Sequence, residues 1–196
     1  LLIGHAGHPE VVGTMGQLPS GTMTLVETTT DAETVEPPKG TELAFASQTT
    51  LSVDDTAEII SILQRRFPEI ASPKQEDICY ATTNRQKAVK DIAASVDLML
   101  VIGAENSSNS KRLVEVARAA GAAHAVLIAD KNAIDWSVVD EAQHIGLSAG
   151  ASAPESLVQD VVAALSSRYA IDVAEAGHIR ETVNFKLPPI LGSATG

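Results

Sequence analysis

A single pattern of hydrophobic and polar positions recurs along the chain. A short apolar run is followed by a few small polar residues and then by apolar residues spaced three and four apart. Short apolar runs predict buried strands, and the spacing of three and four predicts helices that pack one face against a sheet. Because strands and helices alternate, the pattern predicts an α/β fold with mostly parallel sheets. The six expected strands are residues 1–4, 43–46, 78–81, 98–103, 125–129 and 144–149.

Residue types at the ends of the helical stretches predict where helices begin and end. Ser52 has the spacing of a capping box, and Ser152 precedes Pro154 in what resembles a first helical turn. Gly121 follows a stretch with helical spacing and predicts the end of that helix. Residues 22–35 alternate apolar and threonine-rich positions, which predicts an edge strand.

Two stretches that contain prolines interrupt the pattern, at residues 35–40 and 67–73. The second predicts a junction between two α/β domains, and the first predicts a connection within one of them. At residues 184–196 we expect a strand followed by a loose tail. The chain opens on an apolar run without an initiator methionine. We therefore expect that an N-terminal part of the natural protein is missing from this sequence.

Composition and charge narrow the classes of function. The 196 residues include 25 acidic and 14 basic side chains, a formal net charge of −11, so the basic surface of a nucleic-acid-binding protein is not expected. Aromatic residues make up 3%, too few for a platform that stacks single-stranded bases. The longest apolar stretch, residues 98–104, is far shorter than the roughly 20 residues of a membrane span. The single cysteine, Cys79, excludes disulfides within the chain and indicates a reducing compartment.

Small polar residues follow five of the six expected strands. Hydroxyl, amide and glycine groups at helix starts, together with free backbone N–H donors, bind anions such as phosphate. Because the carboxyl ends of parallel strands meet at one edge of a sheet, these groups would converge on one site. Neither a dinucleotide-binding nor a P-loop glycine pattern accompanies them. The polar segments are residues 5–10, 47–50, 82–85, 106–110 and 149–152.

Each of these segments also has a purely structural interpretation. Ser152 would be a helix cap, and residues 106–110 would be an ordinary turn and cap. His8 and Glu10 would form a solvated helix start, where a carboxylate favours the positive end of the helix dipole. Cys79 would be a small buried hydrophobe. The residues alone leave both interpretations open.

Five motifs occur in order along the chain: Gly-His-Pro-Glu-Val at 7–11, Gln-Thr-Thr-Leu-Ser-Val-Asp-Asp-Thr at 48–56, Ile-Cys-Tyr-Ala-Thr-Thr-Asn-Arg-Gln at 78–86, Asn-Ser-Ser-Asn-Ser at 106–110 and Ala-Gly-Ala-Ser-Ala-Pro at 149–154. Together they closely resemble the 4-hydroxy-3-methylbut-2-enyl diphosphate reductases, iron–sulfur enzymes of the non-mevalonate isoprenoid pathway. The resemblance implies three similar three-layer α/β lobes around a central 4Fe-4S cluster, with one cysteine from each lobe. Residues 1–72 would form the second lobe and residues 73–167 the third. Residues 168–196 would return to a first lobe that the chain lacks.

The resemblance also implies a role for each matching residue. Cys79 matches a cysteine that binds the cluster. Glu10 matches the carboxylate that relays a proton to the departing hydroxyl, and Thr49 matches the threonine bonded to it. Gln48 lies beside this relay. The residues that match positions in contact with the substrate are His8, Thr49, Thr50, Ser107, Ser108, Asn109 and Ser152.

The implied activity is reductive dehydroxylation of an allylic diphosphate to isopentenyl and dimethylallyl diphosphate, with ferredoxin or flavodoxin as electron donor. An open iron would act as a Lewis acid, and an acid would protonate the leaving oxygen. The family's other two cluster cysteines and a further histidine belong to an N-terminal part that this chain lacks, so the chain alone is expected to be inactive. A bacterial protein would be cytoplasmic, and a plastid protein would carry a transit peptide before residue 1.

Two hypotheses from other classes stand beside the reductase. In the first, the same polar segments form a non-enzymatic α/β module that binds a phosphorylated small molecule without iron. In the second, Cys79 is the nucleophile of a hydrolase or transferase, with His8 or His144 as its base. The sequence contains no spacing typical of such a pair.

Overall fold

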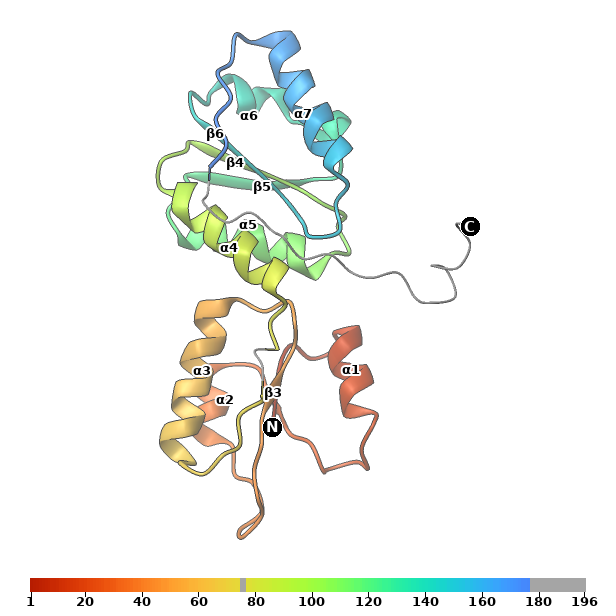
Figure 1. The fold of residues 1–196 in the computed structure, drawn as a ribbon, viewed down its shortest axis with the longest axis vertical. Helices are drawn as coiled ribbons and strands as arrows, with labels where there is room; N and C mark the ends of the chain where they lie inside the picture. Colours follow the sequence, from red (N-terminus) through yellow and green to blue (C-terminus); the bar gives the residue numbers. More distant parts are fainter. Residues whose placement is uncertain (75–76, 177–196) are drawn as a thin grey trace, which may run out of the picture.

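The computed structural model describes residues 1–74 and 77–176. These residues form two units, each built on one three-stranded parallel sheet (Figure 1). We call them the N-terminal half, residues 1–74, and the C-terminal half, residues 77–176. The strand and tail expected at residues 184–196 lie outside the described residues. The predicted α/β class with parallel sheets is confirmed.

The elements of the N-terminal half are β1 (Leu2–Ile3), α1 (Pro9–Met15), β2 (Leu25–Val26), α2 (Thr29–Thr34), β3 (Ala46–Ser47) and α3 (Val53–Arg66). The strands lie in the order β2-β1-β3. Helix α1 covers one face of this sheet, and α2 and α3 cover the other face (Figure 1). Ile3, Val26 and Leu63 are buried in the core between the strands and these two helices. The half therefore has three layers although its strands are only two residues long.

The elements of the C-terminal half are α4 (Tyr80–Ala93), β4 (Leu98–Ile102), α5 (Ser108–Ala119), β5 (His124–Ile128), a short 3₁₀ helix (Lys131–Ala133), α6 (Trp136–Asp140), β6 (Ile145–Ala149) and α7 (Glu155–Arg168). All five residues of β4 are buried. Met99 and Val101 pack against α4 and α5, whereas Leu98 and Leu100 point to the side of α6 and α7. A central strand buried on both faces has no alternation of apolar and polar residues, which explains its continuous apolar run.

The two sheets share one topology. β5-β4-β6 repeats the order β2-β1-β3, so the first strand of each half is central and the next two lie on either side of it. The helices after these strands also correspond, since α1 and α5 follow the central strand and α3 and α7 follow the last one. Loops after equivalent strands therefore occupy equivalent positions in the two halves.

The apolar run at residues 78–81 is not a strand, contrary to the prediction. Cys79 is instead the N-cap of α4, which continues for 14 residues from Tyr80. An apolar run of this length fits a strand or a buried helix equally well. Helical spacing brings Thr82 and Gln86 onto the buried face, and this packing decides the outcome.

Residues 22–35 contain the two-residue strand β2 followed by α2, so the prediction of an edge strand is largely wrong. Thr28 and Asp31 exchange side-chain to backbone hydrogen bonds in a capping box, which starts a helix in this threonine-rich stretch. The strand expected at 43–46 is displaced to Ala46–Ser47, while Ala44 forms an isolated bridge with Ala71.

The predicted helix ends are partly confirmed. Ser52 caps α3, with its Oγ accepting a first-turn N–H at 3.3 Å. Ser152 does not cap α7, which begins at Glu155 after Pro154 and has no side-chain cap. Proline favours the helix start through its fixed φ and needs no such bond. Gly121, just beyond α5, has φ of 103°, a conformation that glycine adopts without strain. No helix within residues 1–74 and 77–176 is long and apolar enough to cross a membrane.

Candidate active site

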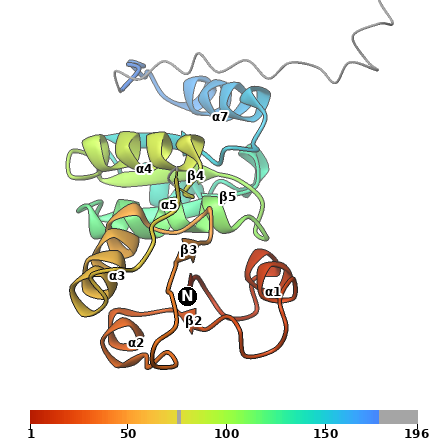
Figure 2. The ribbon, with the colours of Figure 1, turned by 60° about the horizontal axis from the view of Figure 1, so that its bottom comes forward.

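The two halves meet where the loops after β1 and β3 approach the first turns of α4 and α5. Helices α4 and α5 lie on the side of the C-terminal half nearer to the N-terminal half (Figures 1 and 2). The N–H of Cys79 donates to the carbonyl oxygen of Thr49 at 3.3 Å, and the ring of His8 contacts Ser108. The junction therefore brings together residues that are far apart in the sequence.

Glu10 and Thr49 form a tight pair at this junction. Glu10 lies in the first turn of α1, and Thr49 follows β3. The backbone N–H of Thr49 donates to Glu10 Oε1 at 3.1 Å, and its hydroxyl donates to Oε2 at 3.1 Å. Two donors from one residue fix the orientation of the carboxylate. Both residues line a cavity of about 250 Å³, so the paired carboxylate borders space for a ligand.

His8 joins the two halves through its ring. It is the N-cap of α1, and its Nδ1 accepts the N–H of Glu10 at 3.2 Å. Because Nδ1 accepts, the ring hydrogen belongs on Nε2, which lies 2.7 Å from Ser108 Oγ and donates to it. The hydroxyl hydrogen of Ser108 is then left for another acceptor. The His8 imidazole and the Ser108 hydroxyl, which come from different halves, are thus joined by a hydrogen bond.

The first turn of α5 carries further polar groups. Ser107 caps the helix, and its Oγ accepts the N–H of Ser110 at 3.2 Å and the hydroxyl of Ser110 at 2.9 Å. Asn109 is 8% exposed, and its Oδ1 and Nδ2 have no hydrogen-bond partner in the described part of the chain. Leaving a buried amide unpaired is costly, so its donor and acceptor are suited to a polar ligand. The expected alternative of a turn and cap is confirmed for Ser107.

Cys79 presents its thiol at the start of α4. The residue is exposed, and its side chain makes no cap hydrogen bond. Because Cys79 is exposed, the alternative of a small buried hydrophobe is wrong. A thiolate at this position lies at the positive end of the helix dipole. Among the described residues, no group of three or more His, Cys, Asp or Glu side chains is arranged to hold a metal ion.

The other expected residues lie around this centre. Gln48 is buried, its Nε2 donates to Thr50 Oγ1 at 2.9 Å, and its Oε1 accepts the N–H of His5 at 3.1 Å. Gln48 therefore links the loops after β1 and β3. Ser152 is exposed in the turn after β6 and makes no hydrogen bond to the other expected residues that the structure describes.

His144 lies away from Cys79, which counts against a catalytic pair of the two. It precedes β6, whereas Arg85 in α4 binds the carbonyl of Ala149 at the other end of that strand. The backbone N–H groups of His144 and of the residue before it donate to Asp97 at 2.8 and 3.0 Å. These bonds hold the pKa of the Asp97 carboxyl below its ordinary value. The histidine belongs to a structural contact at the amino ends of the strands.

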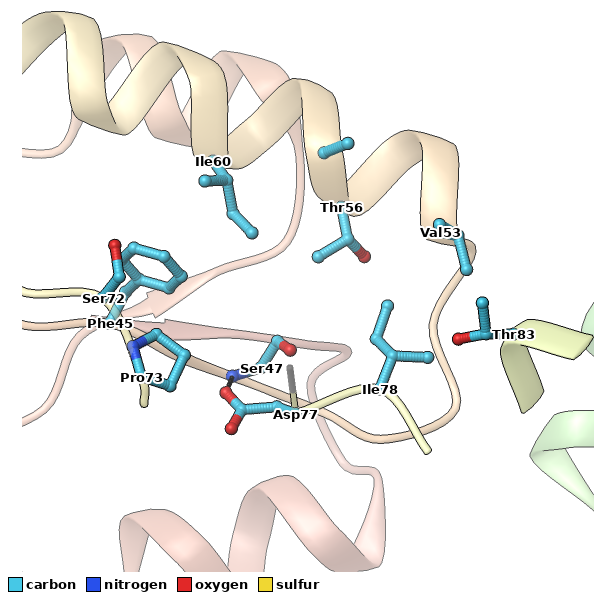
Figure 3. Close-up of a pocket in the computed structure, with 11 residues that line it drawn as sticks. Phe45, Ser47, Val53, Thr56, Ile60, Ser72, Pro73, Asp77, Ile78 and Thr83 are labelled. Carbon is cyan, nitrogen blue, oxygen red and sulfur yellow. Dashed lines mark hydrogen bonds between the residues drawn. The ribbon is translucent and has the colours of Figure 1, made fainter. Parts of the chain in front are cut away.

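A separate cavity of about 260 Å³ lies beside α3 and is mostly apolar (Figure 3). Phe45, Ile60 and Ile78 line it. Asp77 is at its edge and accepts the N–H of Ser47 at 2.7 Å. None of the residues expected to bind substrate lines this cavity. The polar junction is therefore the better candidate for the site of an anion.

Sequence reasoning missed the roles of side chains that connect the halves. Gln86 in α4 bonds to the backbone at the start of α3, and Arg112 Nη2 lies 2.7 Å from His5 Nε2. One signal was available, because Gln86 follows Cys79 by two helical turns and Arg112 follows Ser108 by about one. Both therefore extend the helix face that already carries an expected site residue.

The chain matches a known family over most of its length. The family model described as LytB protein matches residues 1–166. The chain belongs to the LytB protein family. Among similar curated LytB relatives, the 4-hydroxy-3-methylbut-2-enyl diphosphate reductase of Gluconobacter oxydans (strain 621H) is 58% identical over 193 residues, which cover 98% of this chain and 57% of that protein. The reductase of Hyphomonas neptunium (strain ATCC 15444) is 59% identical over 191 residues, covering 97% and 61%.

A solved structure also resembles this LytB chain. The E-1-hydroxy-2-methyl-but-2-enyl-4-diphosphate reductase from Plasmodium falciparum has a TM-score of 0.87 and 34% sequence identity, and the match covers 95% of this chain and 59% of that one. The family resemblance inferred from the five motifs is confirmed. The LytB chain spans about three fifths of the length of these relatives.

Proposed function

We propose that this chain forms part of a 4-hydroxy-3-methylbut-2-enyl diphosphate reductase, which makes isopentenyl and dimethylallyl diphosphate. The main support is the binding of both Glu10 carboxylate oxygens by Thr49, whose carbonyl in turn accepts the N–H of Cys79. The Glu10 carboxylate, the Thr49 hydroxyl and the residue with the Cys79 thiol are therefore connected through Thr49. The family membership and the names of the relatives agree with this activity.

The proposed reaction removes one hydroxyl group. The bond between carbon and the hydroxyl oxygen breaks, and the oxygen leaves as water after taking up a proton. Two electrons and a second proton, which goes to the allylic carbon chain, complete the balance. Ferredoxin or flavodoxin is the proposed electron donor. We place the protein in the cytoplasm of a bacterium, or in a plastid if its source is a plant or alga.

Cys79 is the proposed ligand for an iron–sulfur cluster. Thiolate is the usual ligand of such clusters, and the exposed sulfur of Cys79 has no cap hydrogen bond to compete with a metal. A bound 4Fe-4S cluster would supply the two electrons and an open iron that acts as a Lewis acid. Because the chain has one cysteine, the other two ligands would come from outside this sequence. The chain alone would therefore be inactive.

Glu10 and Thr49 are the proposed proton relay. When Glu10 carries a proton on Oε2, that oxygen can donate to Thr49 Oγ1, and the Thr49 hydroxyl can pass its own hydrogen to the leaving oxygen. The N–H of Thr49 holds Oε1 meanwhile, so the carboxyl does not rotate away. Positioned proton transfer of this kind contributes about 100- to 10,000-fold to a rate.

The groups at the start of α5 are the proposed diphosphate site. Ser108 has a hydroxyl hydrogen to donate, and Asn109 has a buried amide without partners among residues 1–74 and 77–176. Ser107 and Ser152 are further proposed contacts in the C-terminal half, and His8, Thr49 and Thr50 are the proposed contacts from the N-terminal half. Hydrogen bonds to a charged group contribute about 1.5–3 kcal/mol each, so several such donors offset the repulsion from an acidic chain.

The division of the chain into lobes is also a proposal. Residues 1–72 and 73–167 would be two lobes of the enzyme, which agrees with the two sheets of identical strand order. Residues 168–196 would pack on a first lobe. A cluster held between three such lobes would lie where the carboxyl ends of their strands converge.

The variant Glu10→Gln in the full-length protein tests the proposed function. Glutamine keeps an oxygen acceptor for Thr49 but cannot deliver a proton. We expect iron content and the visible absorbance of the cluster to be unchanged, and kcat to fall by about 100-fold or more. Anaerobic turnover with a chemical reductant measures kcat without an electron-transfer protein.

Glu58→Gln is the matched control, since Glu58 is an exposed carboxylate on α3. Its kcat should equal that of the unaltered protein. Full activity of Glu10→Gln would remove Glu10 from the relay. An unaltered protein that binds inorganic pyrophosphate but contains no iron after anaerobic purification would instead support the non-enzymatic binding module.

A further inference from the structure

We propose that Arg112 is a positioning residue that clasps the two halves together and holds the loop with His8 against Ser108. The proposal deepens the proposed function, because His8 and Ser108 are both proposed diphosphate contacts. The role assigned to Arg112 is to fix the distance between them, not to touch the substrate.

Arg112 reaches from α5 to two elements of the N-terminal half. Its Nη2 lies 2.7 Å from His5 Nε2 in the loop after β1. Its Nη1 lies 3.9 Å from Asp55 in the first turn of α3 and 2.5 Å from Glu115 on its own helix. The Arg112 side chain is 16% exposed, although its partners His5, Asp55 and Glu115 lie at the surface. One side chain therefore ties α5 to both a loop and a helix of the other half.

The contact with His5 runs parallel to the contact with His8. Ser108 and Arg112 are four residues apart on α5 and lie on one helix face. Their partners, His8 and His5, belong to one short loop. The loop therefore lies along α5 and is attached at two points about one helical turn apart. With two attachments the loop cannot pivot about the bond between His8 and Ser108.

The Nε2 atoms of His5 and His8 have opposite hydrogen-bonding roles. A guanidinium donates hydrogen bonds and cannot accept them, so His5 Nε2 must accept. His8 Nε2 donates to Ser108, because its Nδ1 already accepts the N–H of Glu10. Arg112 thus selects a ring form in His5 that differs from the form in His8. The contact between Arg112 and His5 thus needs a donor on one side and an acceptor on the other. An attraction between surface charges would not require this.

A surface ion pair is the plain alternative for Arg112. Asp55 and Glu115 have side chains that are 73% and 57% exposed, and such pairs contribute little to stability. The Arg112 side chain is nevertheless only 16% exposed, and its contact with the exposed His5 ring requires an acceptor in a defined direction, which a surface ion pair does not. Arginine also has a rigid planar fork that can serve several acceptors at once, which lysine lacks.

A double-mutant cycle in the full-length protein tests the clasp. The variants are Arg112→Met, which keeps the alkyl stem, His5→Phe, which keeps a ring, and the two combined. The first measurement is hydrogen exchange of the backbone amides of residues 8 and 10–12, made without any ligand; residue 9 is proline and has no amide hydrogen. We expect each single variant to speed this exchange by about tenfold and the double variant to add little more.

The second measurement is the dissociation constant for inorganic pyrophosphate, determined by calorimetry. We expect each single variant to raise it by about fivefold to tenfold, again without an additional effect in the double variant. Lys111→Met is the matched control, because Lys111 is the exposed neighbour of Arg112 on α5, and it should leave both quantities unchanged. Arg112→Lys, which keeps the charge but loses the fork, should restore less than half of the lost affinity on a free-energy scale.

Additive effects of the two single variants would overturn the clasp, as would unchanged exchange in Arg112→Met. Circular dichroism at 25 °C checks that each variant is folded, and Arg112→Lys keeps the test valid if Arg112→Met is not. Coupled exchange in a protein that does not bind pyrophosphate would support the clasp and count against the proposed diphosphate site. The failure of either idea is therefore recognised separately.

Discussion

Gln86, 1% exposed on α4, accepts the N–H of Val53 at 3.0 Å in the first turn of α3. Its Nε2 donates to the carbonyl of Leu51 at 2.7 Å. The buried side-chain amide of Gln86 therefore bonds to one backbone N–H and one backbone carbonyl of the N-terminal half. Both partners lie on the chain segment just after Thr49. Because α4 begins beside Cys79, this contact also fixes the thiol relative to Thr49.

Gln86→Leu should destabilise the protein markedly. The substitution conserves most of the volume but leaves the Val53 N–H and the Leu51 carbonyl without partners, at about 1–3 kcal/mol for each buried group. Chemical denaturation of the full-length protein measures the free energy of unfolding. Gln159→Leu on the exposed side of α7 is the control and should change it by less than about 0.5 kcal/mol. Equal stability of the two variants would mean that Gln86 does not join the halves.

Thr49→Val should lower kcat by about tenfold to 100-fold while the protein stays folded. Valine has nearly the same shape and keeps the N–H that binds Glu10 Oε1, but it lacks the hydroxyl that binds Oε2. Thr49→Ser restores the hydroxyl and should recover most of the activity. Steady-state kinetics separate this loss from weaker binding, which would raise KM instead. An unchanged kcat for Thr49→Val would show that the Thr49 hydroxyl takes no part in the proposed relay.

Asp97→Asn should remove a stabilising contribution that depends on pH. The N–H groups of His144 and Gln143 hold the pKa of Asp97 below its ordinary value of 3.8. A carboxyl whose pKa is lower in the folded state stabilises the protein above its unfolded pKa, and this contribution disappears as the pH falls through the folded pKa. The variant should therefore be less stable than the parent at neutral pH, and the difference should shrink below about pH 4.

Denaturation curves at several pH values test this dependence. Asp91→Asn, an exposed aspartate on α4, is the control and should give curves parallel to those of the parent. A difference for Asp97→Asn that stays constant down to pH 2 would show that the charge of Asp97 does not contribute.

Gly150→Ala should weaken pyrophosphate binding and lower stability. A Cβ at this position would lie 2.1 Å from Ser110 Oγ, so the turn after β6 would have to move. That turn carries Ser152 and adjoins the buried amide of Asn109. We expect the dissociation constant to rise by about tenfold, an effect typical of displacing one good hydrogen-bonding group.

Gly13→Ala is the matched control for this substitution. Apart from its chain neighbours and the backbone of its own helix α1, no atom of the described residues lies within 4 Å of a Cβ built on Gly13. Alanine is favoured over glycine in a helix by about 1 kcal/mol, so this variant should be slightly more stable and bind pyrophosphate normally. Unimpaired binding by Gly150→Ala would mean that the turn after β6 does not contribute to the anion site.

The sequence was most informative where structure depends on local spacing. The strand at 98–103 and the cap at Ser52 were predicted because apolar runs and capping residues act on their immediate neighbours. The meeting of Glu10 with Thr49 was inferred from the resemblance, and it agrees with the rule that parallel strands present their carboxyl ends together. These features require only topology and residue type.

The contacts between the halves were not predictable in the same way. Gln86 and Arg112 are ordinary polar residues of amphipathic helices, and their importance depends on how two separate sheets dock. The run at 78–81 misled because four apolar residues do not distinguish a strand from a helix start, and Cys79 and Tyr80 are in fact exposed where α4 begins. Periodicity describes which face of an element is buried but not which partner buries it.

The identical order of the two sheets makes the starts of α1 and α5 counterparts of each other. His8 and Ser107 are equivalent positions, since each is the N-cap of the helix that follows the central strand of its half. The His8 ring then bonds to Ser108, the residue next to that equivalent position. The contact between the halves therefore joins the cap of one helix to the first residue of its counterpart, while the second cap, Ser107, remains bonded within its own helix. A substitution at either helix start would thus alter the junction as well as its own half.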